Sequence, residues 1–131
     1  MELNKILLVD DDATFNFLNK AALKQFGISC SIDEALNGKK ALEYIMSHEC
    51  PDVLLLDLNM PVMAGIEFLK EYQKQARCIE HTKVYILTSS LRDEDKMAIM
   101  KFSCVKGYFP KPLSADHVEA IKSGFQPKVG N

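Results

Sequence analysis

The chain has 131 residues, of which 47% are hydrophobic and 26% are charged, and its formal net charge is −2 at pH 7. This length predicts one domain with a single hydrophobic core over residues 1–126, followed by a loose tail over residues 127–131. The 16 Lys and Arg residues do not exceed the 18 Asp and Glu residues, so no basic surface for direct nucleic-acid binding is expected. No apolar run approaches the roughly 20 residues that cross a bilayer, and no signal peptide is recognisable, so we expect a cytoplasmic protein without membrane contact.

The four cysteines are scattered along the chain, at Cys30, Cys50, Cys78 and Cys104. No two of them have the C-x-x-C spacing of a zinc site or of a thioredoxin-like redox motif. Because cysteines stay reduced in the cytosol, we expect four free thiols, some of them packed in the core.

Short aliphatic segments alternate with amphipathic segments along the chain. In chain order, strands are expected at residues 5–9, 29–33, 53–56, 84–87 and 107–109, the second and the last being the weaker candidates. Helices are expected between them, and their apolar faces are, in turn, Phe15, Leu18, Ala22 and Leu23; Ala41, Leu42, Ile45 and Met46; Ile66, Leu69 and Tyr72; Met97, Ile99, Met100 and Phe102; and Val118 and Ile121. Nearly uninterrupted apolar strands are typical of a parallel sheet that helices cover on both faces, so the alternation predicts a doubly wound α/β fold with a five-stranded parallel sheet.

Polar side chains follow several of these strands. Three aspartates at positions 10–12 come directly after the first strand, Asp57 follows the third, Thr88 the fourth and Lys111 the last. Ligands bind at the carboxyl ends of the strands in such folds, so we expect these side chains to converge. Clustered carboxylates need a cation, and their oxygen atoms favour Mg²⁺, whereas a lysine suits a phosphoryl oxygen. Because an aspartate can act as a phosphoryl-accepting nucleophile, the set indicates phosphoryl transfer.

Four motifs together resemble the receiver domain of the two-component response regulators. They are Ile-Leu-Leu-Val-Asp-Asp-Asp at 6–12, Asp-Leu-Asn-Met-Pro-Val-Met-Ala-Gly at 57–65, Leu-Thr-Ser-Ser at 87–90 and Gly-Tyr-Phe-Pro-Lys-Pro at 107–112. They occur in the family's order and at its spacing, and they cover essentially the whole chain. The resemblance, which is to a stand-alone receiver like the chemotaxis regulator, implies a flavodoxin-like sheet with the strand order 2-1-3-4-5.

The same resemblance implies a role for each matching residue, and Asp57 matches the phosphoacceptor. The other implied roles are metal binding (Mg²⁺ or Mn²⁺) by Asp10, Asp11, Asp57 and the backbone carbonyl of Asn59; phosphoryl binding by Thr88 and Lys111; a switch formed by Thr88 and Tyr108; and a cis peptide bond before Pro112.

Simpler structural roles stay open for some of these residues. Asp10 and Asp11 occupy positions that also favour capping of the first helix, and a half-buried packing role suits Tyr108 nearly as well as a switch. Asp12 is expected to point to solvent or to cap the first helix rather than to bind metal. The sequence departs from the family pattern at Ala64, which predicts a weaker helix cap, and at Pro110, which is tolerable if the last strand lies at a sheet edge.

The resemblance implies a receiver that takes a phosphoryl group from a sensor histidine kinase or a histidine phosphotransfer protein. Its output would be contact with an unidentified downstream protein, it would be a monomer or a weak dimer, and its only catalysis would be its own phosphorylation and dephosphorylation. Two other functions remain open: a small Mg²⁺-dependent phosphatase with Asp57 as its nucleophile, and a receiver-like scaffold that is not phosphorylated. The lack of a second acid two residues after Asp57 argues against the phosphatase, and the complete set of site residues argues against the scaffold.

Overall fold

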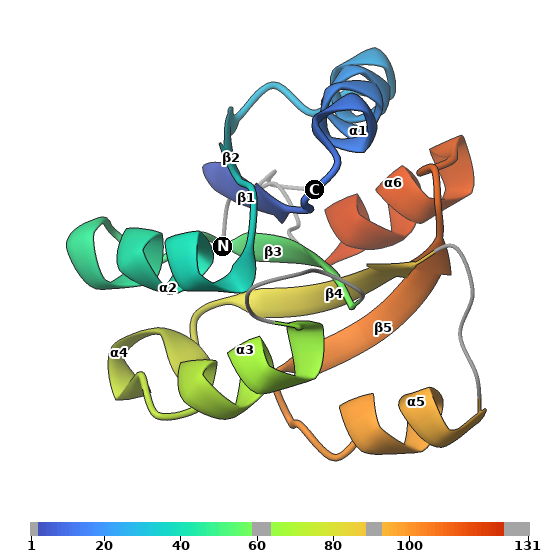
Figure 1. The fold of residues 1–131 in the computed structure, drawn as a ribbon. Coiled ribbons are helices and arrows are strands. Elements are labelled where there is room, and N and C mark those ends of the chain that lie inside the picture. Colours follow the sequence, from blue (N-terminus) through green and yellow to red (C-terminus); the bar gives the residue numbers. More distant parts are fainter. Residues whose placement is uncertain (1–2, 59–63, 89–92, 125–131) are drawn as a thin grey trace.

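Five parallel strands form the centre of the protein (Figure 1). The structure is a computed structural model that describes residues 3–58, 64–88 and 93–124. The strands are hydrogen-bonded in the order β2-β1-β3-β4-β5, which confirms the predicted sheet and its strand order. Their bounds are β1 Lys5–Val9, β2 Ser31–Ala35, β3 Val53–Asp57, β4 Lys83–Thr88 and β5 Val105–Pro110.

Six helices connect the strands in the described part of the chain. Their bounds are α1 Ala13–Gln25, α2 Gly38–Ser47, α3 Gly65–Tyr72, α4 Ala76–Ile79, α5 Asp93–Ile99 and α6 Ala115–Ser123. Helices α1 and α6 cover one face of the sheet, and α2, α3 and α5 cover the other (Figure 1). The sequence does not predict α4, because its four residues are too few to show a helical period and no side chain caps its start.

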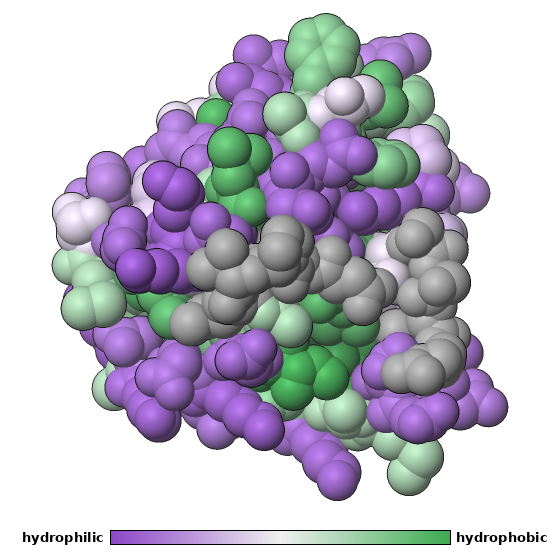
Figure 2. Space-filling view, in the orientation of Figure 1, coloured by the Kyte–Doolittle hydropathy of each residue, from purple (hydrophilic) through white to green (hydrophobic). Residues whose placement is uncertain are grey.

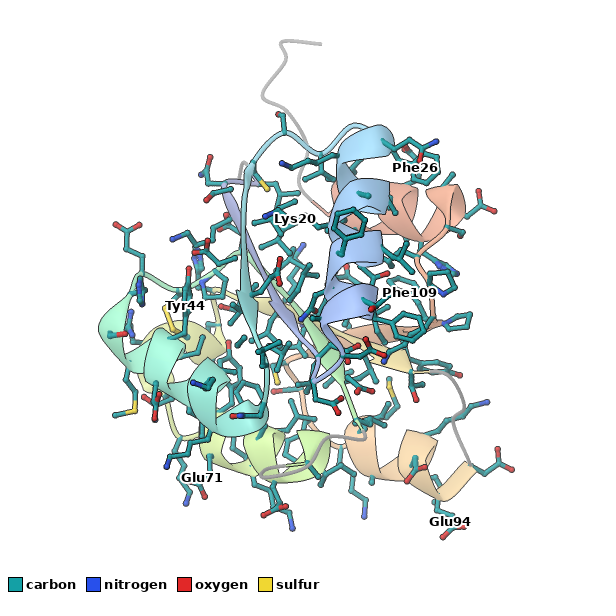
Figure 3. The ribbon with its side chains drawn as sticks, turned by 45° about the horizontal axis from the view of Figure 1, so that its top comes forward. Lys20, Phe26, Tyr44, Glu71, Glu94 and Phe109 are labelled. Atoms are coloured by element: carbon teal, nitrogen blue, oxygen red, sulfur yellow. A yellow bond between two sulfur atoms is a disulfide. The ribbon has the colours of Figure 1, made fainter. Side chains whose placement is uncertain are left out.

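The sheet divides the hydrophobic core into two layers. Leu7 and Leu54 point into the layer that α2 and α3 cover, whereas Leu8 and Leu55 point into the layer beneath α1 and α6. The ring of Phe109, on the second side, stacks on those of Tyr85 and His117 and lies across the sheet from Tyr44 of α2 (Figure 3). Because the central strands β1 and β3 are buried on both faces, polar side chains can be placed only at their ends.

The buried face of α1 differs from the predicted one. Leu18 is 44% exposed, whereas Asn16 and Asn19 are each 1% exposed. Each asparagine makes one buried hydrogen bond: Asn16 Nδ2 donates to the Asp10 carbonyl oxygen at 3.0 Å, and Asn19 Oδ1 accepts from the Leu113 N–H at 3.1 Å. Helix α1 therefore ties the loops after β1 and β5 together through amide groups.

Two predicted strands and one predicted helix face also need correction. Strand β2 lies two residues later than the predicted range 29–33, and β5 begins two residues before Gly107. Ile99, the last residue of α5, is fully buried as predicted, but Met97 of α5 is 69% exposed and Met100, which follows the helix, is 55% exposed. Helix α5 has only seven residues, so it turns one large apolar side chain into the core and leaves Met97 at the surface.

Two of the four cysteines are paired, so the prediction of four free thiols is wrong. Cys50, in the loop after α2, forms a disulfide with Cys78 of α4, and their Cα atoms are 5.4 Å apart. Cys30 and Cys104 are free. The paired residues are 28 positions apart in the sequence and meet only because α4 packs beside the loop that precedes β3, which no local spacing could reveal.

The face of the molecule drawn in Figure 2 is mostly polar. Figure 2 shows hydrophilic residues over most of one face, with hydrophobic residues gathered between α3 and α5. None of the helices in the ranges 3–58, 64–88 and 93–124 has the length and apolar character needed to cross a membrane. The predicted tail, residues 127–131, lies outside the described residues.

Candidate functional site

The polar residues that were predicted to converge lie at the carboxyl edge of the sheet. Asp10 directly follows β1, Asp57 ends β3, Thr88 ends β4 and Lys111 directly follows β5. All four side chains are almost fully buried. Parallel strands place their carboxyl ends along one edge, so residues from four separate parts of the sequence come together here. Asn59 falls outside the described residues, and its carbonyl ligand stays a prediction.

Three carboxylates form the centre of the site. One ligand atom from each of Asp10, Asp11 and Asp57 lies within 4.8 Å of the other two. Asp10 and Asp57 are buried, and Asp11 is exposed. At an effective dielectric constant of about 20, two unit charges at this distance repel each other by about 3 kcal/mol. The cluster therefore favours a bound cation, and its all-oxygen donor set fits a hard divalent ion such as Mg²⁺.

Asp12 does not belong to this cluster. Its Oδ1 accepts a hydrogen bond of 2.9 Å from the Thr14 N–H and caps α1, as predicted. Its own backbone N–H donates to Asp10 Oδ1 at 2.9 Å. The third aspartate thus starts the helix and orients the first, while Asp11 faces the solvent side of the cluster.

Lys111 brings a buried ammonium group to the carboxylates. Its Nζ lies 2.6 Å from Asp10 Oδ2 and 3.5 Å from Asp57 Oδ2. The same nitrogen lies 4.5 Å from the centre of the Phe15 ring, on the first turn of α1. The Lys111 N–H donates to the Thr88 carbonyl oxygen at 3.1 Å, which fixes the backbone of the lysine to the end of β4. The ammonium group offsets part of the negative charge and remains within reach of Asp57.

The backbone around Lys111 has the predicted features. The Lys111–Pro112 peptide bond is cis, and Asn19 of α1 holds the next residue through the Leu113 N–H. Pro110 lies on β5, which is an edge strand, so its missing N–H does not interrupt the sheet. Periodicity alone missed Phe15 as a neighbour of Lys111 and the two buried amides of α1. The detectable feature was a pair of asparagines three residues apart, which places both on one face of the helix.

Thr88 and Tyr108 lie on the same face of the sheet. In the register of β4 and β5, Tyr108 is opposite Ile86 and Pro110 is opposite Thr88, so Tyr108 is one side-chain position before Thr88 on the neighbouring strand. Tyr108 is 40% exposed, and Lys96 Nζ of α5 lies 5.4 Å from the centre of its ring. This placement is compatible with both predicted roles, a switch coupled to Thr88 and a packing residue against α5.

Gly65 allows α3 to begin directly against the end of β3. A Cβ atom at this position would lie 2.8 Å from Leu58 Cα and 2.9 Å from the Asp57 carbonyl oxygen, so another residue would displace the backbone of Asp57. The predicted weak cap is confirmed, because Ala64 has no side-chain acceptor. Glu67 Oε1 accepts from the Ala64 N–H at 3.4 Å. This is one of the two hydrogen bonds of a capping box, and the one from a side chain at position 64 is missing.

Comparisons with protein families and with individual proteins point to the same family. The response regulator receiver domain matches residues 6–122. Chemotaxis protein CheY of Bacillus subtilis is 33% identical over 119 residues, which cover 90% of this chain and 94% of CheY. The probable methanogenesis regulatory protein FilR2 of Methanothrix harundinacea is 33% identical over 126 residues, covering 89% of this chain and 80% of FilR2.

The fold agrees with the sequence comparisons. The crystal structure of a two-component response regulator from Cytophaga hutchinsonii superposes with a TM-score of 0.84 at 25% identity, covering 95% of this chain and 97% of that one. Some relatives are much longer: the chain covers only 24% of the DNA-binding transcriptional regulator NtrC of Escherichia coli, to which it is 29% identical. The matched residues include Asp10, Asp57, Thr88 and Lys111. The chain belongs to the response regulator receiver domains of two-component signalling.

Proposed function

We propose that this chain accepts a phosphoryl group on Asp57 from the phosphohistidine of a sensor histidine kinase or a histidine phosphotransfer protein. The observation that carries the proposal is the meeting of Asp57 with two further carboxylates and a buried ammonium group at one edge of the sheet. A carboxylate is a suitable nucleophile, and the loose transition state of phosphoryl transfer is stabilised chiefly by positioning and charge neutralisation.

Asp57, Lys111 and Thr88 have different roles in the proposed reaction. An oxygen atom of Asp57 attacks phosphorus while the bond from phosphorus to the donor nitrogen breaks, and the nitrogen keeps the electron pair. Lys111, already 3.5 Å from Asp57, pairs with an oxygen of the transferred group, and the Thr88 hydroxyl donates a hydrogen bond to another. The buried position of all three side chains strengthens these interactions because little water screens them.

Asp10, Asp11 and Asp57 would hold the divalent cation, Mg²⁺ or Mn²⁺, with the Asn59 carbonyl as the further ligand that the family implies. When bound, the ion neutralises charge on the transferring phosphoryl group. We expect Mg²⁺ at ten times its Kd to raise the free energy of unfolding by about 1.4 kcal/mol. Asp11→Ala should remove this gain, whereas Asp12→Ala should retain it, because Asp12 caps α1. A larger effect of Asp12→Ala would contradict the proposed ligand set.

The proposed output is a change of the surface formed by α5, β5 and α6, which a downstream protein would contact in the cytoplasm. When the Thr88 hydroxyl turns towards the phosphoryl group, it leaves space on the face that it shares with Tyr108, and the tyrosine ring can move into that space. Amide exchange with and without beryllofluoride tests this step in the monomer. Changes confined to the neighbourhood of Asp57, with residues 103–114 unaffected, would contradict the switch.

The central experiment uses acetyl phosphate and Mg²⁺, with intact mass as the measurement. The wild-type chain should gain one phosphoryl group, and Asp57→Asn should gain none. Asp52→Asn is the matched control, because Asp52 is an equally buried aspartate at the opposite end of β3. Turnover of small phosphoesters without a stable adduct would support the phosphatase instead, and no incorporation in the wild-type chain would support the unphosphorylated scaffold.

A further inference from the structure

A second group of reactive side chains lies at the opposite end of the sheet from the acid cluster. Cys50 comes shortly before β3 and Cys78 shortly before β4, so the disulfide joins the segments that lead into the strands carrying Asp57 and Thr88. The carboxyl ends of those strands hold the proposed phosphoryl site. The disulfide therefore lies a full strand length away from that site and is free to serve a separate reaction.

The two paired cysteines differ in burial. Cys78 is fully buried in the core layer of α2 and α3. Cys50 is only half-buried and lies in a surface loop. Thiol–disulfide exchange requires an attacking thiolate to reach one sulfur atom along the line of the S–S bond. A partner can therefore attack Cys50, and Cys78 is then the leaving group.

Arg77 places a positive charge beside the accessible sulfur atom. Its Nη1 donates to Cys50 Sγ at 3.4 Å and to the His48 carbonyl oxygen at 3.1 Å, and its Nη2 donates to the Ile45 carbonyl oxygen. Carbonyl groups around the end of α2 thus hold the guanidinium group in place. A fixed cation next to a cysteine favours its thiolate form, so Cys50 is the sulfur that is suited to carry negative charge after reduction.

Helix α4 is also held by contacts that do not involve the sulfur atoms. The Cys78 carbonyl oxygen accepts from the Tyr72 hydroxyl at 3.2 Å and from the backbone N–H groups of His81 and Thr82, each at 3.0 Å. Thr82 Oγ1 donates to the Pro51 carbonyl oxygen at 2.6 Å, which links the two loops a second time. None of these hydrogen bonds involves a sulfur atom, so we expect the oxidised and reduced chains to share one fold.

We propose that Cys50 and Cys78 form a reversible thiol–disulfide exchange site whose substrate is the dithiol of a partner protein. The partner's first thiolate attacks Cys50 Sγ, the S–S bond breaks, and Cys78 leaves as a thiolate that takes up a proton. The partner's second thiol loses its proton and attacks the partner sulfur of the mixed disulfide, which releases the Cys50 thiolate beside Arg77. The partner ends as a disulfide and the chain as two reduced cysteines, so two electrons have moved.

The first test traps the mixed disulfide. The oxidised full-length chain is incubated with a thioredoxin-type dithiol protein whose second cysteine is replaced by serine, and the adduct is located by peptide mass mapping. We expect it on Cys50, with Cys30→Ser, which removes the half-buried free thiol, reacting within about twofold of the wild type. Cys50→Ser should form no adduct at this loop. No adduct on the oxidised chain, or an adduct on Cys78 alone, would overturn the proposal.

The second test measures the return reaction and the fold. The reduced chain is reoxidised with a low-molecular-weight disulfide, and Arg77→Gln should slow the reaction about threefold, because the lower thiolate fraction outweighs the higher reactivity of each thiolate. Far-ultraviolet circular dichroism should be the same in both redox states. Loss of helix signal on reduction, or failure of the reduced pair to reoxidise, would show a fixed structural crosslink or an unpaired set of thiols, and either result would overturn reversible exchange.

Discussion

The two ends of the central sheet surround a buried aspartate in opposite ways. At the amino end, Asp52 receives three donors: Oδ2 accepts from the N–H groups of Asn4 and Lys5 at 2.7 and 3.0 Å, and Oδ1 lies 2.8 Å from His81 Nε2. At the carboxyl end, Asp57 shares a small volume with two other carboxylates and one ammonium group. The two residues are equally buried, so exposure alone does not distinguish them.

The difference lies in the neighbouring charges. A buried carboxylate with a donor for each oxygen is stabilised in place and fixes the loops around it. A carboxylate among like charges is held there by the rest of the fold at a cost in stability, and it gains from any bound cation or phosphoryl partner. We infer that Asp52 maintains the structure of the loops at the amino end, whereas the carboxylates at the carboxyl end are arranged for ligands.

The largest stability change that we expect comes from opening the disulfide at the amino end. Reduction should lower the free energy of unfolding by about 3.6 kcal/mol, because it frees a segment of 28 residues in the unfolded chain. A domain of ordinary stability, about 5–15 kcal/mol, stays folded after this loss. Urea unfolding with and without reductant measures the change. Cys50→Ser should show no response to reductant, and a loss of acetyl phosphate labelling on reduction would show that the two ends are coupled.

The matched substitutions Asp52→Asn and Asp57→Asn should change stability in opposite directions. Asp52→Asn should lower the free energy of unfolding by about 2 kcal/mol, because a neutral amide accepts more weakly from the backbone and loses the interaction with His81. Asp57→Asn should raise it by about 1 kcal/mol in the absence of divalent cations, because the repulsion within the cluster falls by more than the attraction to Lys111. Urea unfolding with a chelator measures both. Changes of the same sign would contradict the contrast between the two ends.

The sequence was sufficient to predict the carboxyl end and much less informative about the amino end. Three strands, at residues 5–9, 53–56 and 84–87, are nearly free of polar residues, so the acids and the threonine that follow them could be recognised and placed on one edge. Lys111 could be added because it follows the weaker last strand within a family motif. The amino end depends on contacts between distant segments: Cys50 with Cys78, Asp52 with His81, and Arg77 with the end of α2. Neither hydrophobic period nor local motif encodes such pairs.

The face of α1 shows the same limit within one helix. The apolar pattern placed Leu18 inside, whereas Asn16 and Asn19 are buried because backbone groups of other loops supply their partners. Hydrophobic spacing predicts which side chains are buried only where polar side chains have no hydrogen-bond partner except water. Where the fold provides hydrogen bonds, a polar side chain can take the inner position.

Alkaline pH should weaken the amino end through Tyr72, whose hydroxyl donates to the Cys78 carbonyl oxygen. Burial raises the pKa of Tyr72 from 10.0 to about 12. Below pH 10 the residue is protonated in both states; above it, only the unfolded chain loses the proton readily, so stability falls as the pH rises towards 12. The loss is about 1.4 kcal/mol at about pH 11.

Tyr72→Phe provides the control for this pH dependence. The variant cannot ionise at this position, so between pH 10 and about 12 its free energy of unfolding should decline less steeply than that of the wild type. Urea unfolding at a series of pH values gives the difference, in which the other tyrosines and the lysines cancel. Parallel curves for the two proteins would contradict the raised pKa of Tyr72.

The smallest expected effect concerns how the carboxyl end of the sheet positions the ammonium group of Lys111. Lys111 Nζ lies 4.5 Å from the centre of the Phe15 ring, and the side chain is only 8% exposed, so the aromatic face and the carboxylates position the ammonium group together. Phe15→Leu keeps an apolar side chain but removes the aromatic face. We expect the rate of labelling by acetyl phosphate to fall roughly fivefold, which corresponds to about 1 kcal/mol, the size of a partly desolvated cation–π interaction.

Phe17→Leu is the matched control for this substitution, because Phe17 lies on the same helix and is 69% exposed. It should leave the labelling rate unchanged, and Phe15→Tyr, which keeps an aromatic ring, should restore most of the wild-type rate. If Phe15 only filled space, Phe15→Leu and Phe15→Tyr would change stability without separating in rate. Equal labelling rates for Phe15→Leu and Phe17→Leu would therefore show that the carboxylates alone position Lys111, and that the carboxyl end relies on charge without aromatic support.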